Sequence, residues 1–551
     1  MRVRLAVGFL IAVPVAIWLW ILVRYAVNVA CNDDYALLEF INRWHDPAQS
    51  WATRFADLIA LHNTHRIIYD RLVSLGSYYL TGQISFLLMI WLGNLALLGI
   101  CWQLWRGFRQ AGQPIWYFLP IPYWLFSLQS HENMFWAMAA LQNFTVIWFV
   151  LEALHQLHRR VPIIWPLLLS VAATVTSGNG ILAFLVGALL LFSQQRRDRS
   201  LLIWVVSTAL ALWLMLGLSS VHHERTPFLS WLPNACLALG SAFTNEINMG
   251  LPMAGGALLA TVMLIALVCW VTKFGKVGQR LQQLPISAEW LAFGLFTLTT
   301  ALLLAMHRLP DELLRERYKV YAHLMLSLAY LVVLVTARAR LQVVWAAGIT
   351  LVAVLMNASA FHACLPRIVA GFQQRQADAF NFQVNQSTLA IPYTRQPTDS
   401  LLGRVHQQHL YSFPNTIKPP AAWSAIPAAD SLLISSFQDD FVRNSALGEH
   451  PCYIQVVNQH MPHTLTDDTD RGIYLVVESA DQKKHLFPAS PDKGAIRDFV
   501  MGRGPFKPGF SALFLSSRLK PGDYRVKVLR IANGTYQLIG SGQPLEIRSI
   551  Y

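Results

Sequence analysis

The sequence predicts an all-α polytopic membrane bundle of about eleven transmembrane helices, followed by a C-terminal soluble domain rich in β-strands. The 551-residue chain is 54% hydrophobic and only 13% charged, with a mean hydropathy of +0.40. A soluble globular chain carries roughly 25% charged residues. Apolar runs close to the ~20 residues that a helix needs to cross the hydrocarbon core recur up to residue 361. The remainder of the chain lacks them.

The predicted spans follow the apolar runs 5–29, 80–105, 114–129, 134–154, 163–176, 180–194, 201–219, 250–272, 288–306, 320–337 and 341–361. The third, fifth and sixth runs are short, which fits tilted or partly re-entrant segments. The first run resembles a signal peptide. It is long for the apolar part of one and lacks a clean small-x-small cleavage site, so we interpret it as an uncleaved helix.

Basic residues mark alternate loops between these runs, and this pattern predicts the orientation. The loops contain Arg2, Arg4, Arg106, Arg109, Arg159, Arg160, Arg196, Arg197, Arg199, Lys273, Lys276, Arg280, Arg338 and Arg340. The positive-inside rule places this side in the cytoplasm. The net charge of +13 is therefore largely a topology signal, and no nucleic-acid partner is needed to explain it. An odd number of spans then places the C-terminal tail outside, in the periplasm of a bacterial inner membrane.

The tail divides into two parts by composition, so the predicted domains are 1–362 in the membrane, a periplasmic connector at 363–450, and a periplasmic β-sandwich-like domain at 451–551. Short β-rich runs at 452–457, 472–478, 512–516, 524–531 and 536–539 alternate with turns. Asn533-Gly534 between the last two is a strong hairpin signal. Cys364 and Cys452 lie in this outer region, where disulfides persist, and we expect them to pair.

Polar and ionisable residues outside the basic loops gather next to span ends on the predicted outer side. Six segments contribute them: Asn32-Asp33-Asp34, His62-Asn63-Thr64-His65-Arg66, His131-Glu132-Asn133, Ser177-Gly178-Asn179-Gly180, the loop with His222-His223-Glu224-Arg225 and Asn245-Glu246, and 307–318 with Arg308, Arg315, Arg317 and Tyr318. We interpret this gathering as a polar site at the outer mouth of the bundle.

Each segment also has a structural explanation. The acid pair Asp33-Asp34 fits a helix cap, and 177–180 fits a tight turn. His62 and His65 are spaced to share a helix face, which is compatible with a divalent metal, although solvated histidines are the commoner case. Arginines at 308–317 fit interfacial snorkelling. Since they lie on the side that the positive-inside rule leaves poor in positive charge, an anionic ligand explains them equally well.

The combination of these segments suggests chemistry. A carboxylate directly after the first span can act as a general base toward a hydroxyl. Arginines near a later span can hold a phosphate or pyrophosphate leaving group through bidentate hydrogen bonds. A site at the lipid boundary suits a donor whose tail stays in the bilayer.

In this arrangement the chain resembles the GT-C superfamily of membrane glycosyltransferases. The resemblance rests on the many spans, Asp33-Asp34 in a long first outer loop, an amphipathic stretch at about 55–75 and a soluble C-terminal domain. It implies a polyprenyl-phosphate-linked sugar donor and a periplasmic glycan acceptor such as O-antigen or lipopolysaccharide. It also implies that Asp34 or Asp33 is the base or a metal ligand, and that Arg66, Arg315 and Arg317 bind the lipid phosphate. The subfamily and the sugar are not identified by it, and no cofactor is certain.

Two other classes of function remain open at this stage. A transporter or flippase of a lipid-linked glycan usually has ionisable groups deep in its spans and internal repeats. Here the clearly polar residues of the spans are mainly Asn94, Gln142 and Asn143, which favours the enzyme. A non-catalytic scaffold would explain the β-domain but not the outer polar cluster. A ligase or polymerase of lipid-linked glycans would usually carry its large outer loop between spans.

Overall fold

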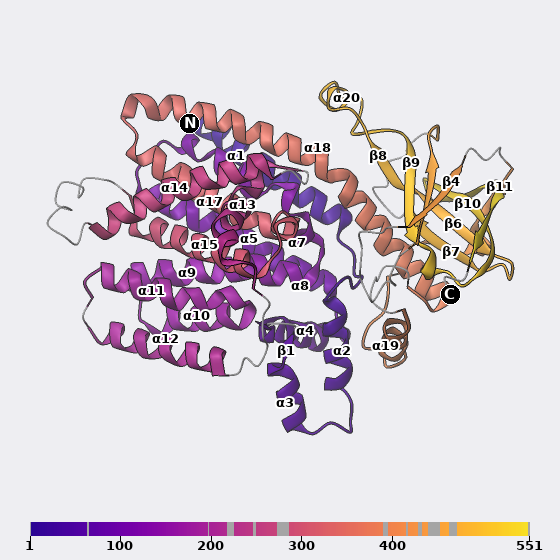
Figure 1. Cartoon of the computed structure of the whole chain (residues 1–551), viewed down its shortest axis with the longest axis horizontal. Helices are drawn as coiled ribbons and strands as arrows, with labels where there is room; N and C mark the ends of the chain where they lie inside the picture. Colours follow the sequence, from indigo (N-terminus) through magenta and orange to yellow (C-terminus); the bar gives the residue numbers. More distant parts are fainter. Residues whose placement is uncertain are drawn as a thin grey trace. The chain divides into compact units, whose positions relative to one another are not determined.

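The computed structural model describes residues 2–62, 65–196, 198–217, 225–245, 249–272, 286–388, 395–414, 417–427, 432–438, 452–461 and 471–548 (Figure 1). The predicted polar residues Asn63, Thr64, His222, His223, Glu224 and Glu246 lie outside these ranges. The chain forms two compact units. The first unit comprises 1–20, 50–73 and 89–361, and the second comprises 21–49, 74–88 and 362–551. The second unit thus includes two N-terminal segments that the sequence assigned to the membrane domain.

The part of the chain that the structure describes is mostly helical up to residue 385, as the composition predicted. Within the described residues, seven helices are long and apolar enough to cross a membrane: Arg4–Tyr25, Phe86–Gln110, Ala137–His158, Gly250–Trp270, Ala288–His307, Glu316–Thr336 and Ala339–Asn385. Four shorter apolar helices are Ile164–Thr176, Gly178–Ser193, Arg199–Leu214 and Phe228–Phe243. The multi-pass character is therefore supported.

The structure differs from continuous spans joined by plain loops in two places. The run 114–129 is not one helix but three short ones, η1 (Ile115–Phe118), α6 (Pro120–Leu125) and η2 (Leu128–Ser130). Prolines at 114, 120 and 122 remove backbone donors and favour helix starts over a continuous span. The outer loop predicted to hold Arg225 and Asn245 contains helix α13 (Trp231–Gly240). This ten-residue helix is too short to be detected as a span.

The helices of the first unit include long spans and short helical turns. Their bounds, with those of the N-terminal helices of both units, are α1 (Arg2–Tyr25), α2 (Asp34–Trp44), α3 (Trp51–Ile59), α4 (Ile68–Thr81), α5 (Phe86–Gln110), α7 (His131–Phe135), α8 (Ala137–Ala139), η3 (Ala140–Thr145), α9 (Val146–His158), α10 (Ile164–Thr176), η4 (Gly178–Ile181), α11 (Leu182–Ser193), α12 (Arg199–Gly217), η5 (Phe228–Ser230), η6 (Ser241–Phe243), α14 (Gly250–Thr272), α15 (Ala288–His307), α16 (Pro310–Leu313), η8 (Glu316–Tyr318) and α17 (Lys319–Thr336). Helices α9, α10, α11 and α12 lie side by side (Figure 1).

Glycines allow two of these helices to cross at backbone contact. A Cβ on Gly256 of α14 would lie 1.7 Å from the carbonyl oxygen of Cys236 in α13. A Cβ on Gly240 of α13 would lie 1.8 Å from the carbonyl oxygen of Pro252. Small residues at helix crossings are a common means of association in membranes, where lipid tails are as apolar as side chains. Helix α13 therefore belongs to the packed bundle.

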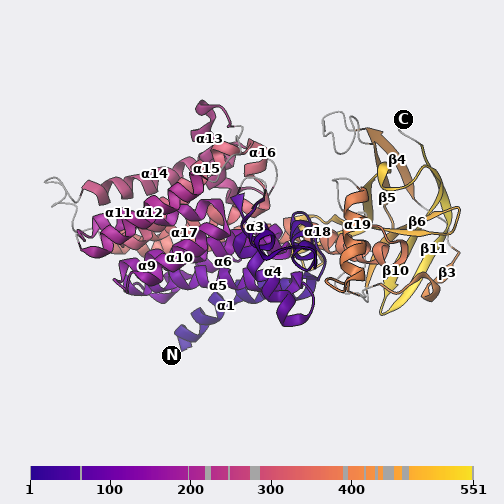
Figure 2. The same cartoon turned by 90° about the horizontal axis from the view of Figure 1, so that it is seen from below.

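The second unit contains the strands from β3 onward, which form two sheets around a common core within its described residues (Figure 2). One sheet has the order β3-β11-β10-β6-β7 and the other the order β4-β5-β9-β8. The strands are β3 (Ser424–Ile426), β4 (Leu433–Gln438), β5 (Cys452–Asn458), β6 (Arg471–Ser479), β7 (Lys484–Pro488), β8 (Ser490–Lys493), β9 (Phe506–Leu515), β10 (Gly522–Ala532) and β11 (Thr535–Ile547). All five predicted β-runs overlap strands. The predicted connector contributes α19 (Arg395–Gln407), η9 (Pro420–Ala422), β3 and β4.

The second half of the long helix α18 (Ala339–Asn385) covers the outer face of the five-stranded sheet. Ala377 and Phe380 of α18 pack against Tyr474, Leu529 and other buried side chains of that face. Asn381 completes the exposed edge of β7, since its Nδ2 donates to the Leu486 carbonyl at 2.7 Å and its Oδ1 accepts from the Leu486 N–H at 2.8 Å. An open sheet edge is a site for unwanted pairing, and α18 closes this one.

The predicted hairpin at Asn533-Gly534 is confirmed, but the predicted disulfide is wrong. Asn533 and Gly534 have φ of 49° and 73°, and Ala532 pairs with Thr535 across the turn. Positive φ at both central residues defines the tight hairpin turn that Asn-Gly favours. Cys364 and Cys452 form no disulfide. Cys364 is buried within α18, whereas Cys452 begins β5 opposite Gln438 of β4.

Candidate functional site

A carboxylate and a guanidinium define the centre of the polar site in the first unit. Arg317 Nη1 lies 3.7 Å from Glu132 Oε2, and the Arg317 backbone N–H donates to the same oxygen at 3.3 Å. The guanidinium also lies over the rings of Trp136 and Tyr318, 5.7 Å and 5.1 Å from their centroids. Glu132 comes from α7 and Arg317 from η8, so the contact joins segments 185 residues apart.

Amides fix the backbone around this pair. Asn133 is fully buried, and its Nδ2 donates to the Arg317 carbonyl at 2.9 Å. Its Oδ1 accepts from Asn143 Nδ2 at 3.0 Å. Asn143 lies in η3, a π-helical turn within the span that continues to His158. Such turns are rare and are frequent at functional sites.

A second group of predicted residues lies around His65. His62 and His65 do not share a helix face; they are partners in a two-residue antiparallel pair, β1 (Leu61–His62) with β2 (His65–Arg66), and their ring centroids are 6.5 Å apart. The prediction of a helix is wrong here because the chain must reverse between α3 and α4. His65 Nε2 lies 3.4 Å from Gln142 Oε1. A Cβ at Gly178 would touch His65 Cβ at 3.7 Å.

Asn179 connects the 177–180 turn to the helix that follows Arg317. Its Nδ2 donates to the Tyr321 hydroxyl at 2.9 Å and contacts Thr300 Oγ1 at 3.4 Å. Four of the six predicted segments thus meet in one region of the first unit, through His65, Glu132, Asn133, Asn179, Arg317 and Tyr318.

A neighbouring buried network holds the 244–245 segment, the fifth predicted one. Lys319 is 3% exposed and donates to the Thr244 carbonyl at 2.8 Å. Gln129 Nε2 donates to Asn245 Oδ1 at 2.8 Å, and Gln129 Oε1 accepts from His323 Nε2 at 2.8 Å. Lys319, Gln129 and His323 were not among the predicted site residues. His323 carried a usable signal, since an ionisable residue inside an apolar run is a candidate functional residue.

Other predicted residues of the first unit have local partners. Arg66 donates to the Ile59 carbonyl at the end of α3, where a positive charge complements the helix dipole. His131 Nδ1 contacts the Leu128 carbonyl at 3.1 Å. Arg308 Nη1, in the extended residue after α15, lies 3.9 Å from Glu312 Oε1 of α16. Arg315 is exposed at the start of η8, and its charge acts on Glu132.

Glu132 has unusual proton affinity for a glutamate near two arginines. Burial raises its pKa above the usual range, and the charges of Arg317 and Arg315 offset only part of this effect. Glu132 keeps 31% of its side chain exposed, so a ligand can reach it. A carboxyl with a raised pKa and an accessible oxygen is suited to exchange a proton with a ligand.

Asp33 and Asp34 belong to the second unit. Asp33 is exposed at the N-cap of α2 and makes no side-chain capping bond there. Asp34 is 1% exposed, and its Oδ2 accepts from the Cys31 backbone N–H at 3.3 Å. Burial and the nearby Asp34 charge raise the pKa of the Cys31 thiol, and Arg375 opposes them.

Asp34 therefore lies in a buried charged cluster with Arg375 and Asp378 of α18. The same two acids help to raise the pKa of Tyr35 and of Tyr411, after the larger effect of burial. The Tyr411 hydroxyl donates to the Asn28 carbonyl at 3.0 Å. These contacts join the 21–49 segment to α18 and to the region after α19, and they give Asp34 a structural role.

We expect Asp34→Asn to lower the thermal stability of the protein and Asp33→Asn to leave it unchanged. The first change removes a buried charge beside Arg375, which typically costs about 1–3 kcal/mol. The second alters an exposed residue, where effects stay within about 0.5 kcal/mol. Thermal unfolding of the purified full-length variants in detergent measures both. Equal midpoints would show that Asp34 does not hold the second unit together.

Among the described residues no group of three or more His, Cys, Asp or Glu side chains is placed to hold a metal ion. Comparisons with protein-family models, curated proteins and solved structures gave no match to this chain. A function is therefore inferred from its own residues and their geometry.

Proposed function

We propose that the chain is a membrane glycosyltransferase that moves a sugar from a polyprenyl-phosphate donor to a glycan acceptor at the outer face of a bacterial inner membrane. The observation that carries the proposal is the Arg317–Glu132 pair with Arg315 beside it, at the end of apolar helices. A lipid-linked phosphate needs cations at membrane depth, and a hydroxyl nucleophile needs a base close by.

In the proposed reaction the acceptor hydroxyl attacks the anomeric carbon of the donor sugar. The new bond joins this oxygen to the carbon, and the bond from the carbon to the phosphate oxygen breaks. Arg315 and Arg317 neutralise the leaving lipid phosphate, because guanidinium matches phosphate geometry in a bidentate way. The phosphate competes with Glu132 for Arg317, which frees the Glu132 carboxylate to accept the hydroxyl proton.

Glu132 replaces Asp34 as the preferred base in this proposal. Asp34 is 1% exposed and engaged in the second unit, whereas Glu132 is accessible and lies beside the phosphate-binding arginines. Asp33 stays the second candidate of the first loop, because it is exposed. His65, Asn133, Asn179 and Tyr318 would shape the sugar subsite.

The experiment that tests the proposal measures sugar transfer from polyprenyl-phosphate sugars by the purified protein in liposomes. Arg317→Gln and Arg315→Gln should each raise the donor KM by about tenfold or more, since a charge-assisted hydrogen bond contributes about 1.5–3 kcal/mol. Arg308→Gln is the matched control, because Arg308 pairs with Glu312 and should leave the KM unchanged. Movement of donor lipid across the bilayer without any sugar transfer would contradict the enzyme and favour a flippase.

The proposed orientation predicts a cytoplasmic N-terminus and an external C-terminus. A reporter that is active only in the periplasm should be active after Tyr551 and inactive after Arg199, since Arg196 and Arg199 lie in a basic loop. The opposite pattern would place the Glu132–Arg317 site on the cytoplasmic side and exclude a periplasmic acceptor.

A further inference from the structure

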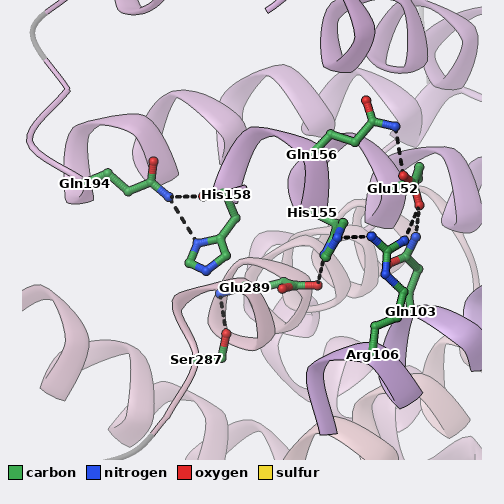
Figure 3. Close-up of polar contacts among 9 residues, drawn as sticks. All are labelled: Gln103, Arg106, Glu152, His155, Gln156, His158, Gln194, Ser287 and Glu289. Atoms are coloured by element: carbon green, nitrogen blue, oxygen red, sulfur yellow. Dashed lines mark hydrogen bonds and ion pairs between the residues drawn. The ribbon is translucent and has the colours of Figure 1, made fainter. Parts of the chain in front are cut away.

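A second polar cluster of the first unit lies at the far end of the span Ala137–His158 from the Glu132–Arg317 site. It is formed by Arg106 of α5, by Glu152 and His155 of α9, and by Glu289 of α15 (Figure 3). Each helical residue advances about 1.5 Å, so His155 lies about 30 Å along the span from Trp136 beside the Glu132–Arg317 site. The two clusters are therefore separate sites of the first unit.

The hydrogen bonds of this cluster orient its histidine. His155 Nδ1 lies 2.8 Å from Glu289 Oε1, and both side chains are almost completely buried. His155 Nε2 contacts an Arg106 amino group. Arginine can only donate hydrogen bonds, so Nε2 accepts and Nδ1–H donates to Glu289. The imidazole therefore holds Arg106 from one side.

Glu152 holds Arg106 from the other side. Its Oε2 lies 3.4 Å from Arg106 Nη1 and also accepts from the Gln103 amide. Its Oε1 accepts from Gln156 at 2.8 Å. Figure 3 shows His155 and Glu152 pointing toward the Arg106 guanidinium, with Gln103 and Gln156 bonded to Glu152. With its side chain 32% exposed, Arg106 is oriented by fixed partners and still accessible.

A cavity of about 420 Å³ opens beside this arginine. It is lined by Arg106, Glu152, His155, Gln156, Arg159, Val161 and Trp165. The Arg159 side chain is exposed and makes no hydrogen bond or ion pair within the described part of the chain, while the Arg159 backbone N–H donates to the His155 carbonyl at 2.9 Å. Trp165 is 56% exposed, and aromatic side chains with this exposure are typical of membrane interfaces.

We propose that this cavity binds the phosphate headgroup of an anionic amphiphile, at the opposite end of the bundle from the glycosyl-transfer site. Two guanidiniums against one carboxylate give the lining a net positive charge. Arg106 is oriented in advance, which lowers the cost of ordering it on binding, and Arg159 supplies a charge that is not already neutralised. Val161 and Trp165 provide an apolar wall for the carbon atoms next to the phosphate.

Arg159 and Arg160 both belong to a basic loop that the topology alone would explain. Of these two residues only Arg159 lines the cavity, although Arg160 is exposed as well. Replacing Arg159 or Arg160 by glutamine changes the charge of the loop by the same amount. A comparison of the two variants therefore distinguishes a binding site that includes Arg159 from a general basic surface.

The test uses the full-length protein in phosphatidylcholine nanodiscs, titrated with dioleoylphosphatidic acid or with inorganic phosphate. Lipid retained on the protein is measured by native mass spectrometry, and the thermal unfolding midpoint is measured in parallel. Wild type and Arg160→Gln should bind phosphatidic acid with the same affinity. Arg159→Gln should bind about tenfold more weakly, because one charge-assisted contact is lost.

The outcomes separate the possible sources of the phosphate. If inorganic phosphate raises the midpoint as well as phosphatidic acid does, and Arg159→Gln abolishes the effect, the site is supported with free phosphate as its ligand. Equal loss in Arg159→Gln and Arg160→Gln would overturn the proposal in favour of a general basic surface. Equal binding by all three proteins would overturn it as well. None of these results depends on sugar transfer.

Discussion

Glu132→Gln should lower the rate of sugar transfer by about 10²–10⁴-fold, the usual loss when a general base is removed. Gln keeps the size of the side chain and can still accept the Arg317 backbone N–H that Glu132 Oε2 accepts at 3.3 Å. The fold and the binding of donor phosphate should therefore be retained. Asp33→Asn is the comparison that distinguishes the two candidate bases. A large loss in Asp33→Asn with little loss in Glu132→Gln would return the role to the first loop.

The pH profile gives this prediction a second readout. Burial raises the pKa of Glu132, so transfer should decline as the pH falls through a value above the usual range for glutamate. Arg317 lowers this pKa, and Arg317→Gln should therefore move the acidic limb to higher pH. The contribution of Glu132 to the stability of the folded protein has the opposite pH dependence. A carboxyl with a raised folded pKa contributes stability below its unfolded pKa and loses this contribution as the pH rises. An acidic limb that stays fixed in Arg317→Gln would contradict the coupling.

Gly256→Ala should destabilise the first unit by about 1–3 kcal/mol, the usual cost of overpacking. The new Cβ would lie 1.7 Å from the Cys236 carbonyl oxygen, so α13 and α14 would have to move apart. Backbone at this contact cannot rotate away as a long side chain could.

Gly348→Ala is the matched control for this substitution. Gly348 is also a helical glycine of the first unit, but a Cβ there meets nothing within 4 Å. Alanine is the better helix former, so this variant should be neutral or more stable by about 0.5–1 kcal/mol. The measurement is thermal unfolding of the two purified variants in detergent. A Gly256→Ala midpoint equal to that of Gly348→Ala would show that the helix crossing is looser than described.

Local signals in the sequence predicted much of the fold. Long apolar runs gave the candidate spans because a bilayer requires them, and Asn533-Gly534 gave its hairpin because both residues tolerate positive φ. Features that depend on distant contacts were missed. Helix α13 is short and is stabilised by its crossing with α14, and β7 is bounded by Asn381, more than a hundred residues earlier in the chain.

The candidate site shows the same difference between features set by local sequence and features set by distant contacts. Segments at one predicted membrane face were expected to meet, and four of them do so around Arg317 and His65. Which side chains are accessible could not be predicted, because burial depends on partners elsewhere in the chain. Asp34 is covered by tertiary packing that includes α18, whereas Glu132 stays open. The cluster around His155 was missed because its basic residues also serve as a topology signal.

The most direct test of the central claim is an experimental structure of the protein with a bound polyprenyl phosphate in a lipid nanodisc. We expect the phosphate oxygens within hydrogen-bonding distance of Arg315 or Arg317, with Glu132 separated from the Arg317 guanidinium by the ligand. A phosphate bound elsewhere, with the 3.7 Å contact of Glu132 and Arg317 unchanged, would contradict the account.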